Sequence, residues 1–288
     1  MSSGAGWRRL LLRVPPSEAP IASALLEHHT GAFSAVELGR REARVSVYLR
    51  AAQAERATPT IRRALARQRA RHDLSDAELR VESLPDDAWA TSWKRHYGPQ
   101  RIAPGLLIVP SWRRIRAPRG VKALRLDPGM AFGTGQHPTT RLALQLLIGA
   151  LRAQDDVIDV GTGSGILAIA AALKGARVWA CDRDAESVAI ARANFAANGV
   201  HAAEVRKASG IPASFPVADI VVANISARAI VTLAHQARRH LRREGLFIVG
   251  GFSERSRALV SAALRSRQFA LQEERRSGAW LAQVYRRR

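Results

Sequence analysis

Residues 157–165 read Val-Ile-Asp-Val-Gly-Thr-Gly-Ser-Gly, an apolar run that ends in three glycines at alternate positions. The apolar residues 166–173 predict a buried helix, and a second apolar run over 176–181 leads to Asp182. A strand, a glycine turn, a helix and a second strand ending in a carboxylate form a nucleoside-binding unit. The glycines let the backbone approach the ligand, and the carboxylate accepts hydrogen bonds from ribose hydroxyls.

The spacing of the glycines separates two classes of nucleoside site. A dinucleotide site has its third glycine three residues after the second. That position is Ile166 here, and the third glycine comes one residue earlier, at Gly165. The G-x-G-x-G form before an aliphatic helix is typical of S-adenosylmethionine-dependent methyltransferases. A glycine turn also arises by chance between a strand and a helix, but Asp182 after the second strand argues against that interpretation.

The length and composition of the chain narrow the class of protein. The chain has 288 residues, of which 47% are hydrophobic, enough for one large domain and a small one. No apolar run approaches the roughly 20 residues that span a bilayer, and the first residues lack a secretion signal. Cys181 is the only cysteine, which excludes an internal disulfide and a cysteine-based metal cluster. We therefore expect a cytoplasmic monomer without membrane contact, in which Cys181 is a small core residue.

The net charge of the chain is +21, with 45 basic and 24 acidic residues. The basic residues are arginines except for four lysines, which indicates a biased codon composition but does not explain the shortage of acids. Such a surface attracts polyanions such as ribosomal RNA. The alternative is a solvated basic surface without a dedicated partner. We interpret the three arginines at 286–288 as a solvated end rather than a binding device.

The first part of the chain predicts a small domain of its own. Its elements follow the order βαββαβ, with strands at 7–14, 32–38, 43–50 and 79–84 and helices at 17–28 and 60–71. This order predicts a ferredoxin-like α+β domain over residues 1–84. It has no signature of an active site, so we expect it to recognise the substrate. Residues 85–100 predict a helical linker on which two domains can hinge. Trp89 and Trp93 share one face of it, and packing is favoured there over ligand contact.

Residues 101–288 predict a seven-stranded, doubly wound Rossmann-like sheet of the class I methyltransferase type. Strand and helix patterns alternate after residue 156, which indicates parallel strands. Ligands of such sheets lie beyond the carboxyl ends of the strands. Gly161, Asp182 and Asn224 each follow a different predicted strand, so we expect them to meet at one edge of the sheet.

Residues 127–140 read Asp-Pro-Gly-Met-Ala-Phe-Gly-Thr-Gly-Gln-His-Pro-Thr-Thr and open a helix that continues to residue 151. A loop of this composition can fold over a bound ligand, or it can be an ordinary connection. His137 is a candidate general base, but a histidine before a proline is more often a structural hydrogen-bonding residue. Pro138 suits the first turn of the helix.

These segments together resemble the PrmA family of ribosomal protein L11 methyltransferases. The resemblance runs from Trp89 to the C-terminus, and its most specific part is the segment 127–140. It further uses the tryptophans at 89, 93 and 112, the glycine turn, and the residues Val-Val-Ala-Asn-Ile at 221–225. It implies L11 as the substrate, held by the N-terminal domain, and S-adenosylmethionine as the cofactor. The implied cofactor contacts are Thr140, Gly161, Asp182 and Asn224, with Gly163 in the same turn as a further candidate.

The resemblance implies methyl transfer to lysine side chains and to an N-terminal α-amine. Asn224 is placed where it would position the reacting nitrogen, and no dedicated base is evident. The chain departs from the family pattern at Gln136, at Thr162, at Ser226 and in its high positive charge.

Four other functions are weighed against this one. The chain could methylate another protein, such as an electron-transfer flavoprotein subunit. RNA base methylation is disfavoured because no Pro-Pro-aromatic sequence follows Asn224. A non-catalytic ribosome-binding protein would not need the complete set Gly161, Asp182 and Asn224, and a nicotinamide dehydrogenase is disfavoured by Ile166.

Overall fold

The structure is a computed structural model that describes residues 6–30, 34–70, 74, 76–84, 99–110, 113, 115–126 and 137–288. The chain divides into two compact units, Met1–Tyr97 and Gly98–Arg288. Almost all of the predicted linker lies outside the described residues, as do Trp89, Trp93 and Trp112. The same holds for the part of the glycine-dense segment over 127–136.

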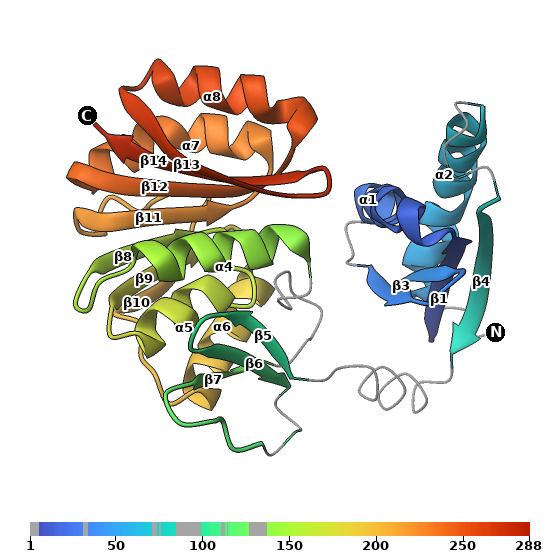
Figure 1. Cartoon of the computed structure of the whole chain (residues 1–288), viewed down its shortest axis with the longest axis horizontal. Helices are drawn as coiled ribbons and strands as arrows, with labels where there is room; N and C mark the ends of the chain where they lie inside the picture. The colour runs from blue at the N-terminus through green and yellow to red at the C-terminus, as the bar shows by residue number, and fades with distance from the viewer. Residues whose placement is uncertain are drawn as a thin grey trace. The chain divides into compact units, whose positions relative to one another are not determined.

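The N-terminal unit has the predicted βαββαβ order (Figure 1). Its elements are β1 (Trp7–Val14), η1 (Pro16–Glu18), α1 (Ala19–Thr30), β2 (Ala35–Leu38), β3 (Ala43–Arg50), α2 (Ala51–Arg69) and β4 (Glu78–Leu84). The sheet order is β2-β3-β1-β4 and every pairing is antiparallel. This is the ferredoxin-like arrangement. A short 3-10 turn, η1, comes before α1, so the helix begins two residues later than predicted.

Helix α2 begins at Ala51, nine residues earlier than the predicted start at residue 60. Its first half presents the small residues Ala51, Ala54 and Ala57 to the core, and Pro59 lies within the helix. Alanine favours helix formation but adds little hydrophobicity, so these turns give a weak periodic pattern. Burial against the strands therefore fixed the first half of this helix, which the apolar spacing did not indicate.

The C-terminal unit is built on a sheet of seven strands in the order β10-β9-β8-β11-β12-β14-β13 (Figure 1). The strands are β8 (Asp156–Val160), β9 (Arg177–Asp182), β10 (Glu204–Lys207), β11 (Ala218–Asn224), β12 (Leu241–Ser253), β13 (Phe269–Ser277) and β14 (Trp280–Arg287). Five neighbouring strands pair in parallel, as predicted for a doubly wound sheet. β14 is antiparallel to both of its neighbours, which an alternation of strands and helices does not reveal.

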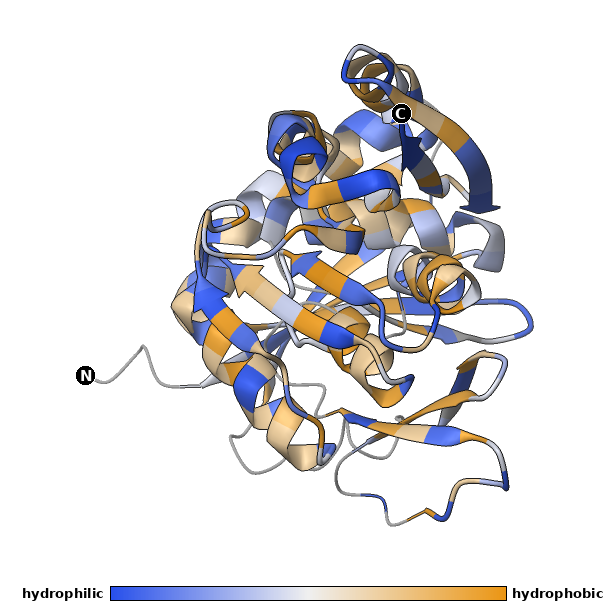
Figure 2. Cartoon of the chain, turned by 90° about the vertical axis from the view of Figure 1, so that its left-hand side faces the viewer, coloured by the Kyte–Doolittle hydropathy of each residue, from blue (hydrophilic) through white to orange (hydrophobic). Residues whose placement is uncertain are grey.

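Helices cover both faces of this sheet. They are α4 (Pro138–Ala150), α5 (Ile166–Leu173) and α6 (Ala185–Ala197) on one core, and α7 (Ala227–His240) and α8 (Arg257–Arg265) on the other. Hydrophobic residues run along the strands that lie between these helices (Figure 2). Because both faces of the central strands are covered, the strands read as continuous apolar runs.

A second, three-stranded sheet joins this unit, in the order β5 (Gln100–Ala103), β6 (Leu106–Pro110) and β7 (Lys122–Leu126). The sequence patterns at 106–109 and 121–126 indicate strands that match β6 and β7, whereas the four residues of β5 give no such signal. Asn198, at the C-terminal cap of α6, holds the sheet in place. Its Oδ1 accepts from the backbone N–H of Arg125, and its Nδ2 donates to the carbonyl of Arg125, both at 2.6 Å. One side-chain amide thus takes the place of a neighbouring strand.

The backbone of residues 286–288 is held by the sheet, and the side chains of Arg286 and Arg288 are exposed, as expected for a solvated end. Arg286 pairs with Leu246 of β12, and Arg287 pairs with Phe269 of β13. The backbone N–H of Arg288 donates to the carbonyl of Gln268 at 2.9 Å. These residues are therefore held in fixed positions at one edge of the sheet.

Candidate cofactor-binding site

The glycine turn connects β8 to α5 at the carboxyl edge of the seven-stranded sheet. Gly161, Gly163 and Gly165 have φ angles of 74°, 54° and 84°. This left-handed region favours glycine because other residues place a Cβ against the backbone. The N–H groups of Gly161 and Thr162 both donate to the carbonyl of Cys181, at 2.8 and 3.0 Å. The turn is therefore hydrogen-bonded to the end of β9. Its three left-handed positions explain why every second residue is a glycine.

Gly161 also lies against the segment that follows β11. A Cβ on Gly161 would stand 2.4 Å from Cγ2 of Ile225, and one on Gly165 would stand 3.4 Å from Cα of Ala191. The first distance leaves no room for a side chain, whereas the second is an ordinary van der Waals contact, so at Gly165 the positive φ is what favours glycine. Gly161 thus serves the packing of the protein as well as the approach of a ligand.

Asp182 ends β9 and faces the glycine turn. Its Oδ2 accepts from the N–H of Gly163 at 2.9 Å, and its Oδ1 accepts from the N–H of Asp184 at 3.0 Å. The side chain is half-buried. A carboxylate has about four acceptor sites, so each oxygen keeps capacity for another donor. The two backbone donors fix the orientation in which Asp182 can receive ribose hydroxyls.

Asn224 ends β11 and is buried against the start of α4. Its Nδ2 donates to Oγ1 of Thr140 at 3.4 Å, and the Thr140 side chain is fully buried. Its Oδ1 is also buried and has no hydrogen-bond partner among the described residues. Leaving a buried acceptor without a donor costs about 1 to 3 kcal/mol. Such an oxygen is therefore a candidate acceptor for a ligand or substrate N–H.

The structure brings the sequence-predicted site residues together in two pairs. Gly163 contacts Asp182, and Asn224 contacts Thr140. Ile225 connects the two pairs, because it follows Asn224 and lies over Gly161. The predicted convergence of strand ends at one edge is present in the fold.

Asp159 is a site residue to which the sequence interpretation gave no role. Its Oδ2 accepts from Oγ1 of Thr162 at 2.7 Å and from the N–H of Ala168 at 3.2 Å. Its Oδ1 is buried without a hydrogen-bond partner in the described part of the chain. Burial raises the pKa of the Asp159 carboxyl to about 7, although the two hydrogen bonds oppose that shift. An acidic residue within an apolar run was the signal for it.

Two further glycines shape the site, and the sequence interpretation missed both. A Cβ on Gly250 would lie 2.9 Å from Oδ1 of Asn224, and one on Gly251 would lie 2.5 Å from the carbonyl oxygen of Ile225. The N–H of Ile225 donates to the carbonyl of Gly250 at 3.1 Å. The glycine pair at the end of the apolar run 246–249 was the available signal. It lets β12 approach the end of β11 closely.

His137 caps helix α4. Its Nδ1 accepts from the N–H of Thr139 at 3.3 Å, with the ring taken in the tautomer that leaves Nδ1 free to accept. The ring packs edge-on against Trp280 with centroids 4.9 Å apart. These contacts support the structural role that the sequence favoured over a general base.

Other reactive groups in the described residues are not arranged for chemistry. Cys181 is buried, its Sγ donates to the carbonyl of Gly210 at 3.3 Å, and burial raises its thiol pKa to about 12. No group of three or more His, Cys, Asp or Glu residues in the described ranges could hold a metal ion. In the same ranges, no helix is both long enough and apolar enough to cross a membrane.

Comparison with known proteins gives a consistent result. The sequence model of the family described as "Ribosomal protein L11 methyltransferase (PrmA)" matches residues 18–288. The ribosomal protein L11 methyltransferase of Enterococcus faecalis is 42% identical over 216 residues, which are 73% of this chain and 68% of that protein. The protein of the same name from Streptococcus equi subsp. zooepidemicus is 37% identical over 261 residues, 88% of this chain and 81% of that protein.

A solved structure adds the fold to this likeness. The crystal structure of ribosomal protein L11 methylase from Lactobacillus delbrueckii subsp. bulgaricus superimposes with a TM-score of 0.63 at 35% identity. The match covers 67% of this chain and 100% of that one. The match to the family model covers more than half of the chain, and the strand-end geometry fits a class I methyltransferase. The chain therefore belongs to the PrmA family of ribosomal protein L11 methyltransferases.

Proposed function

We propose that this S-adenosylmethionine-dependent enzyme methylates primary amines of ribosomal protein L11, namely lysine side chains and the N-terminal α-amine. The observation that carries the proposal is the buried Oδ1 of Asn224, which has no partner among the described residues and lies at the edge that holds the glycine turn and Asp182. An amide oxygen in that place can accept an N–H of an incoming amine.

The residues at the carboxyl edge fit the parts of the cofactor. Asp182 would receive the ribose hydroxyls, and Gly161 and Gly163 would let the backbone approach the ligand. The buried hydroxyl of Thr140, in the first turn of α4, would serve the methionine carboxylate together with the helix-start N–H groups. When bound, S-adenosylmethionine supplies a methyl group on a sulfonium, which is a good leaving group.

Asn224 would orient the amine. The amine nitrogen uses its lone pair to form the new bond to the methyl carbon as the carbon–sulfur bond breaks, and the nitrogen then loses a proton to solvent. Lysine has an unperturbed pKa near 10.4, so the amine must be neutral before it reacts. An amide oxygen accepts an N–H without the negative charge that would stabilise an ammonium ion. We infer that this is why an asparagine rather than an aspartate suits this position.

We further propose the division of labour predicted from the sequence. Residues 1–84 would bind L11, and residues 101–288 would bind the cofactor and catalyse methyl transfer. Residues 85–100 would link these two domains. Motion at the connector is tested by a disulfide cross-link between the two domains. Loss of modification at one site with retention at another is the expected result, and unchanged modification at both would reject the motion.

The proposal is tested by incubating the protein with S-adenosylmethionine and purified L11 and measuring the intact mass of L11. We expect gains in steps of one methyl, and peptide mapping should place them on lysines and on the N-terminal residue. Gains on other residue types would contradict the amine assignment. Absence of any gain while the cofactor still binds would instead direct the search to another protein substrate.

Asn224→Asp tests the role of the amide. Its methylation rate at pH 7 and saturating cofactor should fall about tenfold or more, and its affinity for the cofactor is measured separately because Asn224 also contacts Thr140. A carboxylate that raises the amine pKa by one unit lowers its neutral fraction tenfold. The rate should recover as the pH rises toward 9 or 10. An unchanged pH profile would show that Asn224 does not contact the amine.

A further inference from the structure

The positive charge of the chain is concentrated in the unit that carries the cofactor site. Residues 98–288 hold 29 basic and 13 acidic residues, whereas residues 1–97 hold 16 and 11. The C-terminal unit therefore carries +16 of the net charge of +21. A codon bias toward arginine does not place the excess on one part of the molecule.

Much of this excess gathers where α7, α8 and β14 end. In a doubly wound sheet the helices run back and end at the amino edge of the parallel strands, and β14 is antiparallel and ends there too. The C-terminus marks this edge in Figure 1, and Figure 2 is viewed from that side. We name the following residues the arginine face: Arg238, Arg239, Arg243, Arg265, Arg267, Arg286, Arg287 and Arg288.

Contacts between these elements hold the parts of the chain that carry the arginine face together. The guanidinium of Arg238 donates to the side chain of Gln268, and the N–H of Arg288 donates to the carbonyl of Gln268. The guanidinium of Arg287 donates to the carbonyl of Leu241, which begins β12. The end of α7, the turn after α8 and the ends of two strands are thus joined.

The charge of the arginine face is almost unopposed. Arg286 lies 3.4 Å from Glu244, and both side chains are about half-exposed, so this pair is weak. The other seven arginines form no ion pair with any carboxylate in the described part of the chain. Each helix C-terminus carries about half a negative charge, so the ends of α7 and α8 offset about one of the eight positive charges. Helix capping does not account for the rest.

We propose that the arginine face binds folded RNA through its phosphates. Guanidinium groups bind phosphate oxygens in a two-pronged geometry that ammonium groups cannot form, and the face is made of arginines alone. No exposed aromatic residue in it offers a stacking platform for unpaired bases, so the contacts go to the backbone of structured RNA. Leu271, paired with Tyr285 beside the face, is one exposed large apolar side chain there, and a single such residue gives no apolar patch to enter a membrane.

The position of the arginine face would let the enzyme stay bound to RNA while it transfers methyl groups. The arginine face lies at the amino edge, and the glycine turn lies at the carboxyl edge of the same sheet. RNA on the face leaves the cofactor site open. A substrate that is a ribosomal protein is itself destined for RNA, so such a surface would hold the enzyme beside its substrate.

The test compares two variants that each remove three exposed arginines. Arg239→Gln/Arg243→Gln/Arg267→Gln alters the face, and none of the three forms an ion pair in the described structure. The matched control on α2 is Arg62→Gln/Arg63→Gln/Arg67→Gln. It also removes three exposed arginines that form no ion pair in the described residues. Thermal unfolding of all three proteins confirms that each variant is folded.

The probe is a fluorescein-labelled transcript of large-subunit ribosomal RNA, titrated by anisotropy at several salt concentrations. We expect the face variant to lose at least tenfold in affinity at low salt. The slope of log K against log salt should be smaller in magnitude by about 2 to 3, because each lost phosphate contact reduces that slope by about 0.7 to 0.9. The control should stay within about twofold of the parent.

Three results would overturn the proposal. The first is an equal loss of RNA affinity in the face variant and the control variant. The second is an affinity of the parent for poly-glutamate that equals its affinity for the RNA. The third is an equally high affinity for vesicles rich in phosphatidylglycerol. Methylation of free L11 should be the same in the face variant and the parent. A loss of methylation without a loss of RNA binding would bear on the proposed function alone.

Discussion

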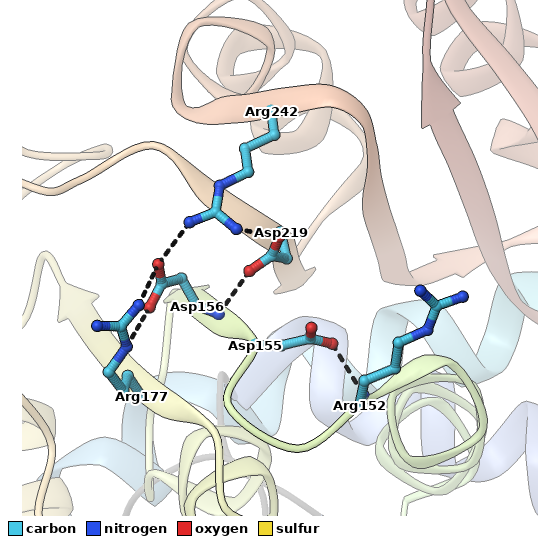
Figure 3. A network of polar contacts seen from close by, with 6 residues as sticks. All are labelled: Arg152, Asp155, Asp156, Arg177, Asp219 and Arg242. Atoms are coloured by element: carbon cyan, nitrogen blue, oxygen red, sulfur yellow. Dashed lines mark hydrogen bonds and ion pairs between the residues drawn. The ribbon is translucent and has the colours of Figure 1, made fainter.

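The two edges of the seven-stranded sheet use polar residues in opposite ways. At the amino edge, Asp156 begins β8 and is 6% exposed, and it pairs with Arg177 of β9 and Arg242 of β12 (Figure 3). The closest atoms are 2.7 and 2.9 Å apart. Asp219 of β11 accepts from the backbone N–H of Asp156 at 2.8 Å and pairs with Arg242 at 2.5 Å. Four strands are thus held together at their starts.

At the carboxyl edge, the same strands end in polar groups that the described protein leaves partly without partners. Oδ1 of Asp159 and Oδ1 of Asn224 are buried without a hydrogen bond among the described residues. Asp182 keeps acceptor capacity toward the solvent side. The amino edge therefore stabilises the fold with partners of its own, whereas the carboxyl edge leaves buried acceptors that the proposed cofactor and substrate would satisfy.

The largest expected effect is the pH dependence caused by Asp159. The pKa of its carboxyl is 3.8 in the unfolded chain and about 7 in the folded protein. Between these values the folded state holds a proton that the unfolded state has lost. The stabilisation is present at low pH and disappears as the pH rises through 7. The free energy of unfolding falls by about 1.4 kcal/mol per pH unit from this group, or about 4 kcal/mol over the window.

Asp159→Asn should remove this dependence, because the amide oxygen can keep the hydrogen bonds from Thr162 and Ala168. Denaturant unfolding of the cofactor-free protein at pH 5 and pH 8 measures it. At pH 8 the free energy of unfolding of the variant should exceed that of the parent. If the charge of Asp159 serves the cofactor, the variant will bind S-adenosylmethionine more weakly even as it gains stability. Parallel pH curves for the two proteins would contradict this account.

The second effect is the loss of cofactor binding when Asp182 is replaced by alanine. A charge-assisted hydrogen bond contributes about 1.5 to 3 kcal/mol, so two lost ribose contacts should weaken binding about a hundredfold or more. Calorimetric titration with S-adenosylmethionine measures the change. Asp184→Ala is the matched control, since this carboxylate caps α6 by accepting from the N–H groups of Glu186 and Ser187 and from the hydroxyl of Ser187. It should cost about 1 kcal/mol of stability and leave the affinity unchanged.

The third effect belongs to the amino edge. Asp156→Asn removes the buried charge that Arg177 and Arg242 share, and both arginines are 49% exposed or more, so water can take over part of their solvation. We expect a loss of about 2 kcal/mol and a fall in Tm of about 5 °C, with cofactor affinity within twofold of the parent. A large change in affinity would show that the two edges are coupled, and the comparison between them would fail.

The smallest effect on stability is expected at Asp155, the residue before Asp156. Asp155 accepts from the backbone N–H of Arg152 at 2.8 Å in an exposed turn (Figure 3). Asp155→Asn keeps an acceptor there and should cost less than about 1 kcal/mol by thermal unfolding. A loss as large as that of Asp156→Asn would mean that burial does not set the strength of this network.

Much of the fold followed from local patterns. The apolar run that ends in Gly161-Thr162-Gly163-Ser164-Gly165 predicted a strand, a turn and a helix, and all three are present. Asp182 was predicted to lie at the same edge of the sheet as Gly161, because it ends the next strand. The first half of α2 and the strand β5 were missed, because alanine-rich or four-residue elements carry too few apolar positions to show a period.

The sequence alone determined which strand ends carry glycine, carboxylate and amide groups, because spacing and residue type are local properties. Which of those groups lack a partner depends on the packing of the folded chain. The orphan oxygens of Asp159 and Asn224, the close approach of Gly250 to Asn224 and the joining of eight arginines into one face depend on neighbours far along the chain. Burial and hydrogen bonding are fixed by packing between elements, so no window of sequence contains them.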